Sequence, residues 1–218
     1  MWVVKLGGSL LSGGYLRSWI DVLARSSRAL VVVPGGGPFA DQVRAAQRRW
    51  DLDDHTAHHM AVLAMEQTAH LLCGLDSRLG RLVDTTARAF GECAGGAQVW
   101  FPATSMLAAD DATPRSWDVT SDSLAAILAL RLRAGGLVLV KSSPLGGLGG
   151  DVLELQSAGL VDGAFHRFGA GCGCPVWLLG RECSADLPRL LEGGPASALG
   201  VAFPASDRNP GAKRSIPP

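Results

Sequence analysis

Two lysines stand at the ends of apolar segments, where burying an ammonium group is costly unless an anion lies close to it. Lys5 is followed by Gly7, Gly8 and Ser9, and Lys141 is followed by Ser142. The chain has only three lysines among its twenty basic residues, so lysine is not its ordinary surface cation. Each of the two lysines therefore predicts a nearby phosphate. The alternative is a side chain that only reaches from a strand end into solvent.

Two glycine clusters offer places where an anion can bind. Gly7 and Gly8 follow the first apolar segment, and Gly35, Gly36 and Gly37 follow the second. Glycine lets backbone N–H groups approach phosphate oxygens, especially where a helix begins. The two loops therefore predict two neighbouring anion sites, with a purely steric turn as the alternative for each. The spacings of the P-loop and of the dinucleotide-binding loop are both missing, which disfavours those two nucleotide-binding folds.

Two aspartates lie at the start of a predicted helix over residues 120–133, which Thr120 or Ser121 would cap. Asp122 falls in the first turn of this helix, and Asp118 lies just before it. In a phosphate-handling site such carboxylates orient a lysine or receive a metal bound to nucleotide phosphates. The alternative is ordinary stabilisation of the helix N-terminus.

A predicted helix from about residue 54 to residue 73 carries four histidines, three of them, His55, His58 and His59, near its start. His55 and His59 share one face, and we expect His59 to donate a hydrogen bond to an acceptor phosphate. An interface or core helix with incidental histidines is the alternative. The histidines lack a third metal ligand, and Cys172 and Cys174 are too close for the usual zinc spacing, so we predict no metal site in the protein itself. Either Glu66 or Asp41 is a candidate partner for an ammonium group on the acceptor, with helix solvation as the alternative.

Short apolar segments alternate with helical patterns along the chain, and they position these side chains. Strands that are apolar on both faces and separated by helices predict an α/β fold, a three-layer α/β/α sandwich with a mostly parallel central sheet. The glycine clusters would then gather at the carboxyl ends of the strands, where ligands bind in such sheets. We expect a single domain over residues 1–203 and a flexible tail over residues 204–218. The predicted strands cover residues 2–6, 29–33, 97–101, 136–140 and 174–179.

Composition excludes several classes of function. Twenty acidic residues balance twenty basic ones over 218 residues, so there is no electrostatic footprint for nucleic acid. The apolar runs are far shorter than the ~20 residues that a membrane-spanning helix needs. The sequence opens directly on a predicted strand without a signal-peptide pattern, and it has five cysteines, an odd number. We therefore expect a cytoplasmic protein that binds neither nucleic acid nor membrane.

The motifs VVKLGGSLL, VVVPGGGPFAD and VTSDSLAAILA, in this order, resemble those of the amino acid kinase family, whose members transfer phosphate from ATP to carboxylates, carbamate or phosphates. The resemblance extends to about residue 191. It implies that Lys5 bridges the transferred phosphoryl group and that Asp122 positions the lysines. It also implies that Gly7, Gly8 and Ser9 hold the donor phosphates, whereas Gly35, Gly36 and Gly37 hold the acceptor anion.

The sequence departs from many members of that family in two places. They carry a Thr-Asp pair followed by Asp-Gly after the strand that here ends at residue 140, and a second lysine after a Gly-Gly-Met stretch near the C-terminus. Neither is present. We expect Lys141 to replace the missing lysine and to bind ATP together with Ser142, and Asp118 to contact the substrate.

The resemblance is greatest to the family's branch in methanofuran biosynthesis. It implies ATP with Mg²⁺, a small phosphomonoester bearing an aminomethylfuran group as acceptor, and a homo-oligomer. The alternatives are a nucleotide monophosphate, an isoprenoid phosphate or an amino acid as acceptor, or a non-catalytic nucleotide- or oxyanion-binding protein. Few aromatic and basic residues surround the second glycine loop, which disfavours a nucleotide acceptor.

Overall fold

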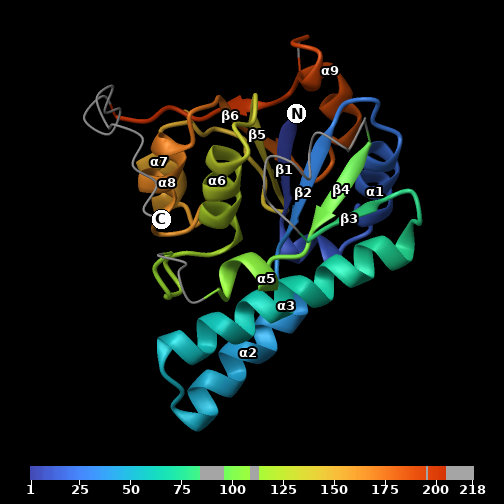
Figure 1. Ribbon diagram of the computed structural model, residues 1–218. Coiled ribbons are helices and arrows are strands. Elements are labelled where there is room, and N and C mark those ends of the chain that lie inside the picture. Colours follow the sequence, from blue (N-terminus) through green and yellow to red (C-terminus); the bar gives the residue numbers. More distant parts are fainter. Residues whose placement is uncertain (84–95, 109–112, 195, 205–218) are drawn as a thin grey trace.

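A computed structural model describes residues 1–83, 96–108, 113–194 and 196–204. A seven-stranded sheet with the order β3-β4-β2-β1-β5-β6-β7 forms its centre (Figure 1). All neighbouring strands pair in parallel except β6 and β7, which are antiparallel. The strands are β1 (Trp2–Leu6), β2 (Leu30–Pro34), β3 (Gly80–Leu82), β4 (Ala97–Trp100), β5 (Leu137–Lys141), β6 (Val176–Gly180) and β7 (Leu199–Gly200).

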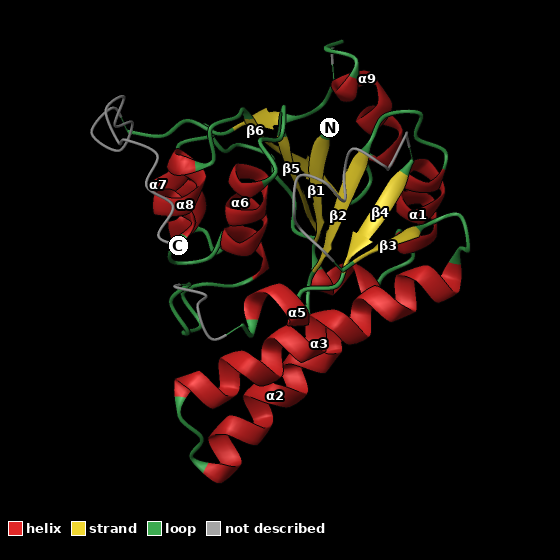
Figure 2. Ribbon diagram, in the orientation of Figure 1, coloured by secondary structure: helices red, strands yellow, loops and turns green. Residues whose placement is uncertain are grey.

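Helices cover both faces of this sheet, as Figure 2 shows. Because side chains alternate along a strand, Val3 of β1 faces one layer and Val4 faces the other. The layer on the Val3 side contains α6 (Ser121–Arg131), α7 (Val152–Ser157) and α8 (Phe165–Gly171). The layer on the Val4 side contains α1 (Leu16–Ala24) and α9 (Leu187–Leu191), the latter preceded by the 3₁₀ helix η2 (Ser184–Asp186). The central strands are buried on both faces, which explains their continuous apolar sequences.

A long helical hairpin lies across the carboxyl ends of the strands. It consists of α2 (Gly37–Trp50) and α3 (Asp54–Leu75), and the short α5 (Ala103–Met106) lies beside α3 (Figure 1). The 3₁₀ helix η1 (Gly8–Ser12) follows β1 and packs against α2. The side chain of Asp53 accepts a hydrogen bond from the backbone N–H of Thr56 and so caps α3. The hairpin therefore covers the carboxyl ends of the strands, where ligands bind in parallel α/β proteins.

The predicted three-layer sandwich with a mostly parallel sheet is confirmed. Each predicted strand is present to within two residues, and the helix expected over residues 54–73 extends two residues further, to Leu75. The short edge strands β3 and β7 were not predicted. The expected tail lies outside the described residues except for residue 204. Within the described residues, no helix is both long and apolar enough to cross a bilayer.

Candidate active site

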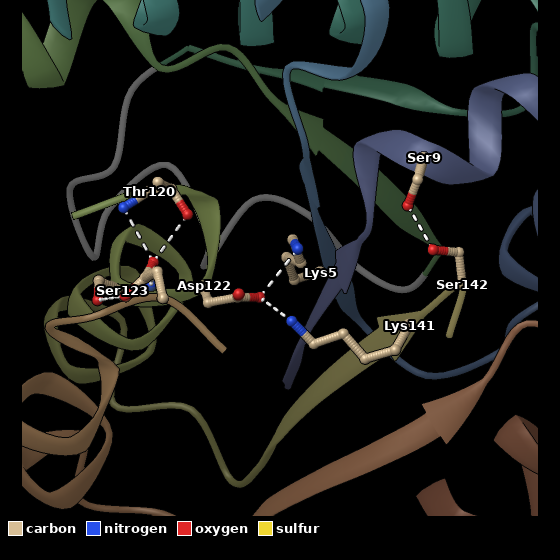
Figure 3. A network of polar contacts seen from close by, with 8 residues as sticks. Lys5, Ser9, Thr120, Asp122, Ser123, Lys141 and Ser142 are labelled. Atoms are coloured by element: carbon tan, nitrogen blue, oxygen red, sulfur yellow. Dashed lines mark hydrogen bonds and ion pairs between the residues drawn. The ribbon is translucent and has the colours of Figure 1, made fainter. Parts of the chain in front are cut away.

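A buried cluster of two lysines and one aspartate lies at the carboxyl ends of β1 and β5 (Figure 3). Lys5 follows Val3 by two residues on β1, and Lys141 follows Leu139 by two residues on β5, so both side chains emerge on the α6 side of the sheet. Asp122 reaches them from the first turn of α6. Its Oδ1 lies 2.9 Å from Nζ of Lys5 and 2.6 Å from Nζ of Lys141. One carboxylate oxygen thus fixes both ammonium groups.

The charges in this cluster control one another. Burial alone would raise the pKa of Asp122, but the positive charges and hydrogen bonds of Lys141 and Lys5 lower its pKa to about 2. Burial lowers the pKa of Lys141 to about 8, although Asp122 opposes that shift. At neutral pH the cluster therefore holds two cations and one anion. Its net positive charge suits a site that receives phosphates.

A second aspartate holds the start of α6 in place. Asp162, from the connection between α7 and α8, accepts hydrogen bonds from the backbone N–H groups of Thr120 (2.9 Å) and Ser123 (3.0 Å). The hydroxyls of Thr120 (2.9 Å) and Ser123 (2.5 Å) also donate to it. Thr120 precedes the helix as predicted, but its side chain does not cap the helix, because Asp162 engages it instead. This network fixes the turn that carries Asp122.

The two glycine loops contact each other through their backbones. A β-carbon added at Gly8 would collide with the backbone nitrogen of Gly37, and one added at Gly35 would collide with the backbone nitrogen of Gly8. Gly37 also has a φ of 52°, in the left-handed region that favours glycine. Only residues without a side chain allow this approach. The two loops therefore form one continuous surface between β1 and the hairpin.

Two cavities border this surface, since Gly8 lines both of them. One, of about 410 Å³, contains the lysine cluster and every residue that we expected to bind ATP. We call it the donor cavity; its lining includes Lys5, Gly7, Gly8, Ser9, Asp122, Lys141, Ser142, Ser143 and the segment from Gly159 to Asp162. Ser9 and Ser142 are also joined across it by a 2.5 Å hydrogen bond between their hydroxyls (Figure 3).

The second cavity, of about 350 Å³, lies beneath the hairpin, and we call it the acceptor cavity. Gly36 and Gly37 line it as expected, together with Asp41, Ser116 and apolar residues of α3. The residues that line both cavities are Gly8, Ser9, Arg44 and Thr120. A donor phosphate and an acceptor phosphate placed in the two cavities would therefore meet at the glycine surface.

Three expected acceptor residues lie elsewhere. Gly35 is buried beneath Gly8, so its role is to let the loops approach. His58 lines the acceptor cavity in place of His59, whose ring instead lies 4.3 Å from that of His55. Burial lowers the pKa of His59, and the charges of His55 and Arg115 add to this effect. Asp118 is exposed and packs beside the backbone of residue 163 instead of lining either cavity.

The two candidate partners for an ammonium group on the acceptor, Glu66 and Asp41, lie in different surroundings. Glu66 accepts a 2.7 Å hydrogen bond from the backbone N–H of Ala103 and so stabilises the start of α5. Asp41 lines the acceptor cavity and forms a 3.1 Å ion pair with Arg44. Asp41 therefore lies at the acceptor cavity, whereas Glu66 stabilises α5.

Sequence reasoning missed the two residues that bring aromatic and basic character to the acceptor cavity, Arg44 and Trp117. Gly37 and Arg44 are seven residues apart, which is two helical turns, and this spacing is the signal that would have placed Arg44 on the face of the glycine loop. Trp117 comes from the connection before α6 and had no such signal. The expectation that few aromatic and basic residues surround the second glycine loop is therefore wrong, and it no longer argues against a nucleotide acceptor.

Comparison with known proteins decides the family. The model of the amino acid kinase family matches residues 1–144, two thirds of the chain, and this span contains both lysines, both glycine loops and Asp122. The chain belongs to the amino acid kinase family. It is therefore a phosphotransferase, and the family implies ATP as its phosphate donor.

Individual relatives agree with this assignment. The [5-(aminomethyl)furan-3-yl]methyl phosphate kinase of Methanocaldococcus jannaschii is 27% identical over 175 residues, covering 78% of this chain and 71% of the relative. Among solved structures, the uridylate kinase from Archaeoglobus fulgidus superposes with a TM-score of 0.63 at 17% identity, covering 89% of this chain and 97% of its own. The UMP kinase from Ureaplasma parvum gives 0.65 at 12% identity, covering 92% and 98%. At these identities the solved structures establish a shared fold.

Proposed function

We propose that this protein transfers the γ-phosphoryl group of ATP to a small phosphomonoester and so makes a diphosphate. The observation that carries the proposal is the meeting of the two cavities at Gly8, Ser9, Arg44 and Thr120, directly beside the lysine cluster. An acceptor phosphate oxygen forms a bond to the γ-phosphorus, while the bond from that phosphorus to the β,γ-bridging oxygen breaks and ADP leaves with the electron pair. The attacking oxygen is already anionic, so no general base is required.

Seven residues of the donor cavity have a proposed part in this reaction. Lys5 and Lys141 stabilise the negative charge that spreads over the transferred oxygens, and Asp122 holds both ammonium groups in position. The backbone of Gly7 and Gly8 and the hydroxyls of Ser9 and Ser142 bind the donor phosphates. Catalysis then consists of positioning and charge stabilisation, without a covalent intermediate.

Magnesium would accompany the nucleotide. The two carboxylates that line the donor cavity are Asp122, held by both lysines, and Asp162, held by Thr120 and Ser123. Among the described residues, both carboxylates of this cavity are therefore already bound by protein groups, and neither is free to bind a cation. Mg²⁺ prefers to keep several waters and to bind phosphate oxygens, so the phosphates of ATP would be its main ligands.

For the acceptor, we propose [5-(aminomethyl)furan-3-yl]methyl phosphate, the compound for which the relative from M. jannaschii is named. The acceptor cavity supports this choice because it combines an apolar wall with the carboxylate of Asp41, which would pair with the aminomethyl ammonium. Its apolar wall includes Ala61, Val62, Met65 and Leu124. A nucleotide monophosphate is the second candidate, because Trp117 offers a ring face and Arg44 a guanidinium in the same cavity.

An acceptor panel tests the proposal. The purified protein is incubated with ATP and Mg²⁺ and with the synthetic furan phosphate, UMP, isopentenyl phosphate or an amino acid, and the products are identified by mass spectrometry. We expect a diphosphate from the furan phosphate at a kcat/KM at least tenfold above that for the others. Asp41→Asn should reduce this preference, with Asp51→Asn, at the end of α2, as the matched control. If the protein phosphorylates none of these acceptors, the proposed reaction is contradicted.

The proposal includes a cytoplasmic location and self-association of the chain. Two large apolar side chains on the hairpin, Trp50 and Leu63, are exposed and support an interface there. Light scattering of the purified protein measures its mass in solution, and a monomer at micromolar concentration would contradict the oligomer.

A further inference from the structure

Arg44 places a permanent positive charge where the two cavities meet, a position that the two lysines do not line. Among the described residues that line the acceptor cavity it is the only lysine or arginine, and it also lines the donor cavity. Lys5 and Lys141 lie in the donor cavity alone and are both held by Asp122. An acceptor phosphate that approaches ATP brings a second large negative charge. A cation at the junction of the two cavities would offset the repulsion between these two anions.

The guanidinium of Arg44 is held by neighbours in a defined place. Its Cζ lies 4.2 Å from the ring centroid of Trp117, within the range of a cation–π contact. The indole N–H of Trp117 donates a 2.6 Å hydrogen bond to Oε1 of Gln47, one turn further along α2. Gln47 in turn donates to Asp54 (2.9 Å) at the start of α3. The hairpin thus fixes the indole, and the indole fixes the face on which the guanidinium lies.

The ion pair of Arg44 is of a kind that a ligand can exchange. Its partner Asp41 is one helical turn away, and the two side chains are 43% and 70% exposed, so water screens their attraction. A phosphate offers the guanidinium two parallel hydrogen bonds in a more enclosed place. Binding of a phosphomonoester would therefore take Arg44 from Asp41 and release that carboxylate toward the rest of the acceptor.

We propose that Arg44 binds the phosphate of the acceptor at the junction of the two cavities, and that Trp117 is the residue that positions it. The inference rests on the proposed function, because it assigns the acceptor cavity to a phosphomonoester. It goes beyond that function in naming the group that recognises the acceptor phosphate and in giving the ion pair with Asp41 a role as its resting state.

Direct binding of benzyl phosphate tests the inference without requiring turnover, since this probe combines a flat apolar ring with a phosphate. Calorimetry compares the wild-type chain with Arg44→Gln, Arg44→Lys and the matched control Arg48→Gln, an exposed arginine on the same helix. We expect Arg44→Gln to weaken benzyl phosphate binding about 10- to 100-fold, the loss typical of a charge-assisted contact. Arg44→Lys should recover part of the loss, and Arg48→Gln should bind like the wild type.

Two further variants separate positioning from folding. Trp117→Leu removes the ring face and should weaken benzyl phosphate binding, whereas Trp117→Phe keeps a ring face and should restore most of it. Wild-type affinity in Arg44→Gln would overturn the inference, as would failure of the wild-type chain to bind millimolar benzyl phosphate. If the wild type binds the probe through Arg44 yet phosphorylates no acceptor of the panel, the proposed reaction fails and this inference stands.

Discussion

Removing the charge of Asp122 is the most direct perturbation of the lysine cluster. In Asp122→Asn the two ammonium groups lose the oxygen that lies 2.9 Å from Lys5 and 2.6 Å from Lys141. All three residues are at most 7% exposed, so water compensates only weakly for the lost carboxylate. The net charge of the cluster rises from one to two among side chains that are almost entirely buried.

The size of the effect follows from this burial. Removing one partner of a buried ion pair destabilises a protein by about 3–5 kcal/mol, because a buried charge is left uncompensated. Since single domains are stable by only about 5–15 kcal/mol in total, this loss is large. Asp118→Asn changes an exposed aspartate near the start of the same helix, and it should alter the free energy of unfolding by no more than about 0.5 kcal/mol.

Urea denaturation followed by circular dichroism measures these differences at pH 7. Adding Lys141→Met to Asp122→Asn returns the net charge of the cluster to one, so the double variant should be more stable than Asp122→Asn alone. Both variants should lose catalytic activity, because the lysines no longer hold their positions. An Asp122→Asn protein within 1 kcal/mol of the wild type, or a double variant less stable than Asp122→Asn, would refute the electrostatic account of the cluster.

Three further predictions concern the same site. The pKa of Lys141 is about 8, so kcat/KM should fall as the pH rises through 8 and the ammonium group loses its proton. The free energy of unfolding should instead rise between pH 8 and 10.5, because the unfolded chain binds more protons than the folded chain in that range. The pH profiles of turnover and of the urea midpoint measure both effects, and in Lys141→Arg the fall in activity should disappear. Gly8→Ala should reduce kcat/KM at least tenfold in the turnover assay, because its methyl group collides with the backbone of Gly37, whereas Gly14→Ala, with open space around it, should behave like the wild type. Asp162→Ala should lower the free energy of unfolding by about 2–4 kcal/mol in urea, since four donors lose their acceptor, and an unchanged midpoint would contradict the capping role.

The central strands and the lysine cluster were predictable because local patterns encode them. Continuous apolar runs marked β1, β2 and β5, and alternation along a strand places Lys5 and Lys141 on one face of the sheet. The edge strands β3 and β7 have three and two residues, too few for any periodicity to be read. Their pairing depends on neighbours that are distant in sequence.

The residues expected to bind ATP line one cavity together, whereas three residues expected to bind the acceptor lie outside the other cavity, and this difference has a physical reason. Every residue expected to bind ATP lies at the carboxyl end of a strand or within a few residues after it, and the strand ends converge at one edge of the sheet. The acceptor cavity is instead enclosed by α2, α3 and the connection before α6, so its lining depends on how helices pack. A rotation of one residue along α3 decides between His58 and His59. The contributions of Asp162 and Trp117 depend on contacts made over 39 and 70 residues, which no local pattern encodes.

The two cavities of the site are built largely by different parts of the sequence, as the strand order shows. From β1 the chain builds outward to β2 and β4 on one side and to β5 and β6 on the other. Most walls of the acceptor cavity arise before residue 66, whereas much of the donor cavity arises after residue 140. A change of acceptor can therefore evolve, or be engineered, by rewriting the early hairpin while nucleotide handling in the later segment is left untouched. Among the described residues, the four that line both cavities are the only lining positions at which a redesign for a new acceptor would also affect the nucleotide.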